Sequence, residues 1–184
     1  MVPNVAGHVG ERQRLRGWGL AREPDQVRGL TEFNDLPDDS ATAALTGCCS
    51  SQRWVDAVLA GRPYAAAEDL LVASDAAVAA LTAADLHDAL AAHPRLGEQV
   101  NAEQALVMGS AERARRALAE GNAEYERRFG HIYLACATGR SAGDLLAFLR
   151  ERLGNDPETE WRVVAAELAK INQIRLRKLT GGAA

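Results

Sequence analysis

Residues 82–97 read TAADLHDALAAHPRLG, and this one segment contains both a helix start and a helix stop. Thr82 and Asp85, three residues apart, resemble a capping box in which Asp replaces the usual Glu or Gln. Pro94 disfavours the helical conformation in the residue before it, so the helix is expected to stop at or before His93. The segment therefore predicts a short helix that ends in a forced break of the backbone.

One face of this helix is apolar and ends in a histidine. Leu86, Leu90 and His93 follow one another at spacings of four and three, which places them on the same face. An acid–amide pair, Glu103-Gln104, comes about ten residues after His93. Because a histidine titrates near neutral pH, this corner suits a small site for proton chemistry. The alternative is structural. The helix dipole would favour His93 at the C-terminal end of its helix, Glu103 would be one of the acids that are common in a first helical turn, and Gln104 would form half of a cap.

The composition favours an all-α fold. Hydrophobic residues make up 47% of the 184 residues but aromatic residues only 5%, so Ala, Leu and Val must build the core. Ala and Leu lose little conformational freedom in a helix. We expect a single-domain bundle of about seven to nine helices with short connections and no convincing strands.

Capping residues, glycines and prolines divide the chain. A weakly ordered extension is expected over residues 1–30, a helical domain over 31–180 and a flexible tail over 181–184. The apolar segment 129–137 is either extended or a tight helical turn. The helix from 101 to 128 is either continuous or interrupted near Gly109-Ser110 or near Gly121, and the pattern does not decide between these alternatives. The expected helices cover residues 40–47, 51–60, 64–81, 82–93, 101–128, 141–154 and 157–179, with Ser40, Ser51, Thr82, Asn101, Ser141 and Pro157 at their starts.

Arg175 falls in the middle of the apolar stripe of the last expected helix. On a helical wheel Trp161, Val164, Ile171 and Leu179 lie within about 60° of Leu168, and both Arg175 and Asn172 lie among them. In one interpretation Arg175 extends along the helix end to water. In the other its guanidinium reaches inward and binds an anion, because a buried charge needs a partner and Arg matches a carboxylate in bidentate fashion.

Charge and cysteine usage restrict the partners and the compartment. The net charge is −4 and no basic stripe is interleaved with aromatic residues, which argues against a nucleic-acid partner. No apolar run reaches 18 residues, so no membrane partner is expected and the protein should be soluble. The three cysteines, Cys48, Cys49 and Cys136, are an odd number with two adjacent members, which favours reduced thiols and a cytoplasmic protein.

No cofactor or metal signature is present in the sequence. There is no P-loop, no GxGxxG and no GxSxG motif. His87, His93 and Glu98 do not follow a known metal-ligand spacing. A cofactor-free and metal-free site for a small molecule is therefore the expectation.

Taken together, these segments resemble the 2-oxo-4-hydroxy-4-carboxy-5-ureidoimidazoline (OHCU) decarboxylase family, whose enzymes complete the route from urate to allantoin. The resemblance covers about residues 31–180, and the order and spacing of its fragments are specific. The fragments are FNDLP at 33–37, Trp54, RPY at 62–64, HPRLG at 93–97, Glu103-Gln104, NAEYERRFG at 122–130, Cys136, GRS at 139–141, Arg152-Leu153 with Asn155, Glu167, Lys170-Ile171 and Arg175-Leu176.

The resemblance implies an all-α homodimer without cofactor or metal, and it implies roles for individual residues. His93 matches the catalytic histidine of the family, Glu103 and Gln104 its substrate-contacting acid–amide pair, and Arg175 its anion-binding arginine. Further substrate contacts match Pro94 and the backbone of Tyr133, Leu134, Ala135, Cys136 and Ala137.

Two departures from the family pattern concern substrate affinity and loop closure more than the reaction class. The connection between His93 and Glu103 is shorter than is usual, and Val100 stands where the family carries a substrate-contacting serine. The segment 105–108, ALVM, follows the acid–amide pair where a small residue and a glycine are usual. The shortened loop is the main support for an alternative, a non-catalytic helical interaction module that kept the fold. A lyase acting on a related ureido acid is a third possibility that no residue discriminates.

Overall fold

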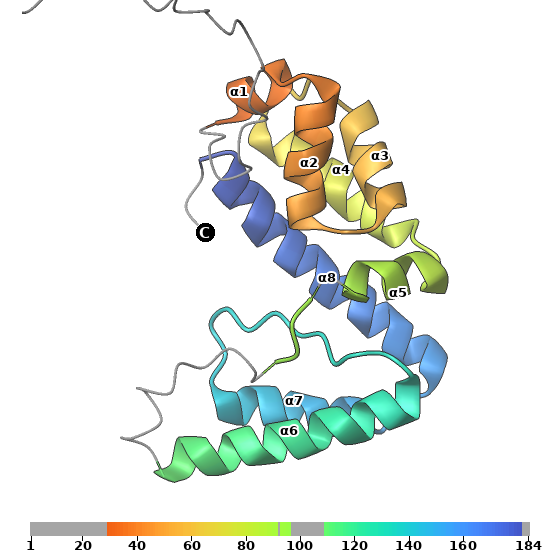
Figure 1. Ribbon diagram of the computed structural model, residues 1–184, viewed down its shortest axis with the longest axis vertical. Coiled ribbons are helices and arrows are strands. Elements are labelled where there is room, and N and C mark those ends of the chain that lie inside the picture. The colour runs from red at the N-terminus through yellow and green to blue at the C-terminus, as the bar shows by residue number, and fades with distance from the viewer. Residues whose placement is uncertain (1–28, 92, 97–108, 182–184) are drawn as a thin grey trace, which may run out of the picture.

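The chain is all-α in the computed structural model, which describes residues 29–91, 93–96 and 109–181 (Figure 1). Within these ranges there are eight helices and no strand, which confirms the predicted fold class. The predicted extension and tail lie almost wholly outside the described residues and stay predictions. The helices are α1 Leu30–Asp35, α2 Asp38–Cys48, α3 Gln52–Ala60, α4 Ala67–Ala79, α5 Ala83–Ala91, α6 Gly109–Phe129, α7 Ala142–Arg152 and α8 Pro157–Leu179.

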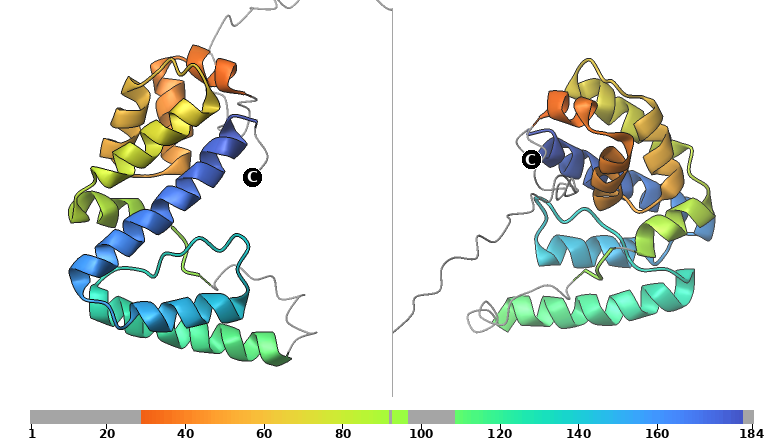
Figure 2. Two further views of the ribbon diagram at one scale, coloured as in Figure 1. Left: turned by 180° about the vertical axis from the view of Figure 1, so that it is seen from behind. Right: turned by 45° about the horizontal axis from the view of Figure 1, so that its top comes forward.

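The helices form a larger and a smaller group, each with its own apolar cluster. In the larger group α3 packs between α2 and α4, and α2, α4 and α5 contact α8, around buried residues such as Leu45, Trp54 and Leu168. In the smaller group α6 and α7 lie side by side, and their cluster includes Leu118 and Leu149 (Figure 2). The long helix α8 runs diagonally past both groups (Figure 1).

Several predicted helix starts are confirmed by their caps. Ser51 accepts a hydrogen bond from the backbone N–H of Trp54 and caps α3. Thr82 and Asp85 cap α5 reciprocally, as do Ser141 and Asp144 at α7. The helix that begins at Pro157 is also confirmed, and α5 ends at Ala91, before the proline break.

Two predicted starts are wrong, one because of a contact far away in sequence and one because of acidic residues in the first turn of the helix. The helix predicted from Tyr64 begins at Ala67, since the side chain of Asn34 pairs with both the N–H and the C=O of Tyr64 and holds the backbone there out of a helix. The helix predicted from Ser40 begins at Asp38, where acidic residues in the first turn complement the helix dipole.

Gly121 does not interrupt α6, and its packing explains why a glycine is there. A Cβ atom at this position would lie 2.5 Å from Cδ2 of Leu149 on α7. The absent side chain therefore permits the close approach of α6 and α7. The predicted start of this helix at Asn101 lies outside the described residues.

The segment between α6 and α7 is extended, as one of the two predictions for residues 129–137 had it. Its side chains alternate between the two apolar clusters: Ile132 and Leu134 contact the larger one, and Tyr133 and Ala135 belong to the smaller one. This period of two is that of an extended chain. The segment is therefore the seam along which the two helix groups meet.

A buried ion pair fixes the seam to α7 and α8. Arg152 at the end of α7 and Glu160 on α8 are 1% and 0% exposed, and the guanidinium Nε and Nη2 donate to Oε1 at 2.8 and 2.5 Å. Arg152 also donates to the carbonyl oxygen of Leu134, and Tyr125 donates its hydroxyl proton to Glu160. The network connects both helices of the smaller group with α8.

In the part of the chain that the structure describes, no single helix is long and apolar enough to cross a membrane. Only α4 and α5 taken as a pair pass that length and composition test, and they are bent by 116° relative to each other.

Replacing Arg152 by Met is expected to lower the free energy of unfolding by about 3 to 5 kcal/mol, because Glu160 would remain buried without its partner. Chemical denaturation followed by circular dichroism measures the change. The control is Arg162→Met, which removes an exposed i,i+4 pair with Glu158 and should change the stability far less. Equal stability of the two variants would contradict the structural weight given to the Arg152–Glu160 pair.

Candidate active site

His93 and Arg175 meet although 82 residues separate them in the chain. His93 follows the end of α5, and Arg175 lies about one turn before the end of the long helix α8. The guanidinium Nη1 is 3.1 Å from Nε2 of the imidazole, and the same nitrogen donates to the carbonyl oxygen of Cys48 at 2.6 Å. The structure thus brings together the two most distant side chains of the predicted site.

These contacts define the tautomer of His93. An arginine has N–H donors and no acceptor, so Nε2 of the imidazole must accept from Arg175 with its lone pair. The proton then resides on Nδ1, which donates to the carbonyl oxygen of Ala89 at 2.9 Å. His93 is therefore neutral, with its basic nitrogen directed at the guanidinium.

The pKa of His93 lies below its ordinary value for a clear reason. Burial disfavours the charged imidazolium, and the positive charge of Arg175 acts in the same direction, while the hydrogen bond to Ala89 opposes both. The lowered pKa therefore favours the base form of the imidazole at neutral pH.

Arg175 does not extend freely into water, and it pairs with no carboxylate among the residues that the structure describes. It is half-buried, and no ion pair joins it to an acidic residue in the described ranges. The neighbouring thiols do not supply a counter-charge, because burial raises the pKa of Cys48 to about 11 and also raises that of Cys49. A guanidinium without an anionic partner in a half-buried position suits a ligand that carries a negative charge or a carbonyl oxygen.

The predicted backbone contacts lie in the seam between α6 and α7. Tyr133, Leu134, Ala135 and Cys136 are buried in the seam, whereas Ala137 is exposed. Two of their backbone groups already have partners from helices, because Leu134 accepts from Arg152 and Cys136 donates to Glu167 at 2.8 Å. Of the other predicted residues, Pro94 is exposed beside His93. Glu103, Gln104 and Val100 lie outside the described residues.

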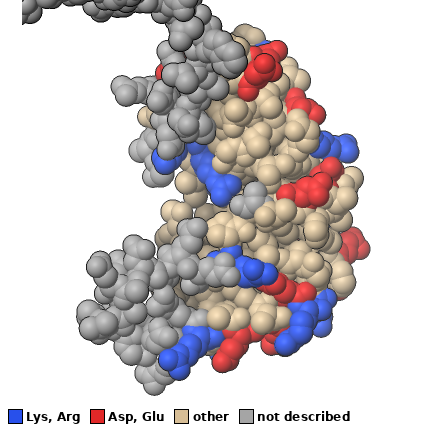
Figure 3. All heavy atoms as spheres, in the orientation of Figure 1, with Lys and Arg blue, Asp and Glu red and all other residues tan. Residues whose placement is uncertain are grey.

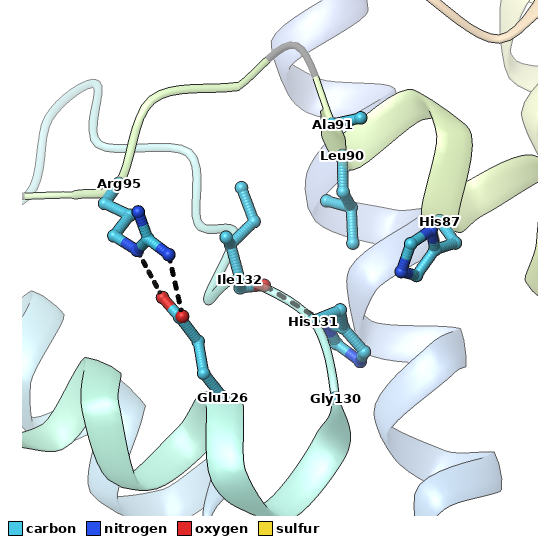
Figure 4. A pocket seen from close by; sticks show the side chains of 8 residues that line it. All are labelled: His87, Leu90, Ala91, Arg95, Glu126, Gly130, His131 and Ile132. Carbon is cyan, nitrogen blue, oxygen red and sulfur yellow. Dashed lines mark hydrogen bonds and ion pairs between the residues drawn. The ribbon is translucent and has the colours of Figure 1, made fainter.

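A pocket of about 280 Å³ adjoins the HPRLG segment and contains none of the predicted site residues (Figure 4). Two of its lining residues, Arg95 and Glu126, form a bidentate ion pair with nitrogen–oxygen distances of 2.6 and 3.0 Å. Its lining residues are His87, Leu90, Ala91, Arg95, Glu126, Gly130, His131 and Ile132.

The sequence alone missed the residues that hold the site in place. Asn122 donates to the carbonyl oxygen of Leu96 at 2.8 Å and, with the Arg95–Glu126 pair, ties the segment after His93 to α6. Glu167 binds the seam, and the carbonyl oxygen of Cys48 binds Arg175. No sequence pattern identifies a backbone carbonyl as a partner. For Arg95, however, its position inside the HPRLG motif was a signal that could have identified it.

The surroundings of the site are mixed in charge and hold no evident metal cluster. On the face drawn in Figure 3, the Lys and Arg side chains are interspersed with Asp and Glu. Within residues 29–91, 93–96 and 109–181, no group of three or more His, Cys, Asp or Glu side chains is arranged to hold a metal ion.

Comparison with known proteins finds one family. The profile of the OHCU decarboxylase family matches residues 34–177. The chain is 32% identical over 139 residues to the 2-oxo-4-hydroxy-4-carboxy-5-ureidoimidazoline decarboxylase of Amia calva, covering 67% of this chain and 77% of that protein. It is 28% identical over 145 residues to the uric acid degradation bifunctional protein TTL of Arabidopsis thaliana, covering 72% of this chain but only 45% of the plant protein.

A solved structure has the same architecture. The crystal structure of an OHCU decarboxylase in the presence of (S)-allantoin superimposes with a TM-score of 0.65 at 28% identity. The match covers 79% of this chain and 99% of that chain.

Replacing Arg175 by Met should raise the pKa of His93, because the variant removes a positive charge that lies 3.1 Å from Nε2. Burial would still keep the pKa below the ordinary value of about 6.5. The pH dependence of the imidazole carbon-bound proton shifts in NMR spectra measures it. Arg177→Met, which removes a charge paired with Glu68, is the control and should leave the pKa unchanged. An unchanged value in the Arg175 variant would show that the two groups do not interact.

Proposed function

The chain belongs to the OHCU decarboxylase family, and we propose that it converts 2-oxo-4-hydroxy-4-carboxy-5-ureidoimidazoline to (S)-allantoin and CO2 in urate degradation. The observation that carries the proposal is the contact between a neutral His93 and Arg175, a guanidinium without a carboxylate partner in the described ranges. The first group is suited to move a proton and the second to hold an anion, and decarboxylation of this substrate needs both.

The substrate supplies its own electron sink. The carbon that carries the carboxylate also carries a hydroxyl and adjoins a ring C=N bond. When the bond to the carboxylate breaks, its electron pair forms a double bond to the neighbouring ring carbon, and the C=N pair moves to the ring nitrogen, which takes a proton from water. The first product is CO2 and an enol, so the reaction needs no cofactor as electron acceptor.

His93 completes the reaction by moving one proton. When the Arg175 N–H turns from Nε2 to the substrate, the released Nε2 lone pair takes the hydroxyl proton of the enol, and the carbonyl group forms as the electrons return to the neighbouring carbon. The imidazolium then gives the proton to one face of that carbon, which produces a single enantiomer and restores the neutral histidine. Arg175 holds the carboxylate or carbonyl oxygen of the substrate in line with this transfer.

The other predicted contacts complete the proposed site. Glu103 and Gln104 hold the ureido and ring N–H groups, while Pro94 and the backbone of the segment 133–137 enclose the ring. Val100 supplies an apolar contact where a serine is usual, which is expected to weaken substrate binding more than catalysis.

The proposed enzyme is a cytoplasmic homodimer. Its described cysteines, Cys48, Cys49 and Cys136, are all free and buried, in keeping with a reducing compartment. Sedimentation equilibrium is expected to give twice the mass of the 184-residue chain at micromolar concentration. A monomer over the whole concentration range would contradict the dimer.

Replacing His93 by Asn should lower turnover by about 10² to 10⁴-fold, the usual contribution of a positioned acid–base group, with the fold intact. The assay generates the substrate from urate with urate oxidase and hydroxyisourate hydrolase, and follows the decay of its ultraviolet absorbance and the optical purity of allantoin. His87→Asn, which changes an exposed histidine on α5, the helix that precedes His93, is the control and should keep full activity. Slow formation of racemic allantoin by the wild type would instead favour the non-catalytic interaction module.

A further inference from the structure

Glu167 is a buried carboxylate that the reaction itself does not use. It lies in the middle of α8, 1% exposed, with Oε2 accepting from the backbone N–H of Cys136 at 2.8 Å and from Arg140 at 3.2 Å. Oε1 accepts from Lys170 at 2.6 Å. Burial acts to raise the pKa of Glu167, but Lys170, the Cys136 N–H and Arg140 outweigh it and hold the pKa below its usual value. The carboxylate is therefore ionised where it meets the seam.

The contact with Cys136 determines which backbone groups of the seam face a ligand. In an extended chain the C=O of one residue and the N–H of the second residue after it lie along the same edge. Leu134 and Cys136 provide such a pair, and Arg152 and Glu167 occupy it from α7 and α8. The N–H and C=O of Ala135 must then point to the opposite edge.

We propose that Glu167 is a positioning residue, which holds the seam so that the backbone N–H and C=O of Ala135 bind the ureido group of the substrate. This inference rests on the proposed function. A ureido group has N–H donors beside a carbonyl acceptor, and it complements the donor and acceptor of one extended residue.

The position of Glu167 on α8 supports this role. Glu167 and Arg175 are eight residues apart on one rigid helix, which separates their Cα atoms by about 12 Å along the axis. Since Glu167 fixes the seam and Arg175 approaches His93, α8 sets the distance between the two ends of the site. A loss of the Glu167 contact would release one end while the His93–Arg175 pair stays in place.

Three variants test the role of Glu167 kinetically. Glu167→Leu, which removes the acceptor, should raise KM by about tenfold, as expected for a lost charge-assisted hydrogen bond that orders the binding wall. Glu167→Gln keeps an acceptor oxygen for the Cys136 N–H and should raise KM by less than about threefold. Leu168→Ala removes the neighbouring buried side chain in the larger cluster and should lower Tm without changing KM.

NMR spectra of ¹⁵N-labelled protein give an independent readout. The Cys136 amide proton should move upfield in Glu167→Leu and remain nearly in place in Glu167→Gln. Addition of (S)-allantoin should shift the Ala135 amide in the wild type and less in Glu167→Leu. If the leucine variant does not fold, Glu167→Met, which keeps the length of the side chain but also removes the acceptor, takes its place in both comparisons.

The outcomes separate the inference from the function on which it rests. A wild type that makes no (S)-allantoin overturns the proposed function and this inference with it. Two results would overturn only the positioning role. One is an active wild type in which (S)-allantoin does not shift the Ala135 amide signal, and the other is a Glu167→Leu enzyme with the wild-type KM. A rise of KM in Leu168→Ala equal to that in Glu167→Leu also overturns it, because the effect would then follow stability alone.

Discussion

Three charged groups on α8 are directed away from solvent, and the rest of the site depends on their placement. Glu160 and Glu167 hold the seam through Arg152 and through the Cys136 N–H, and Arg175 reaches His93. A rigid helix fixes the spacing of these groups, whereas the described residues of the seam and of the segment 93–96 form no helix or strand. The helix therefore acts as the frame of the site, and the seam and the residues after α5 take their positions from it.

The contact between an imidazole and a guanidinium would be unfavourable if both were charged, and this constraint defines the chemistry of the site. The positive charge of Arg175 and the burial of His93 both favour the neutral imidazole, so the site contains one cation and one base. A histidine paired with a carboxylate would instead have a raised pKa and tend to donate. The arrangement here suits a group that first accepts a proton and then returns it.

The sequence predicted the local features well, because caps, prolines and apolar periods act within one helix. Ser51, Ser141 and Pro157 mark helix starts that the structure confirms, and the place of Arg175 in an apolar stripe indicated a polar group facing inward. The late start of α4 could not be predicted, since Asn34 imposes it from 30 residues away. The Glu167–Cys136 contact was also missed, because the two residues are 31 positions apart and the group that Glu167 binds is a backbone N–H, which every residue except proline has.

Because the substrate has its own electron sink, the protein only has to hold the substrate and the proton-transfer group in the right positions. These positions are set by contacts between residues far apart in the chain. The guanidinium of Arg175 binds Cys48 and His93, which are 127 and 82 residues away, and Glu167 binds Cys136 across 31 residues. None of these contacts can form before α8 packs against the helices that precede it. The groups of the site are therefore assembled in the same step that buries the core, and a variant that releases the seam from α8 should weaken binding geometry before it alters the proton chemistry of His93.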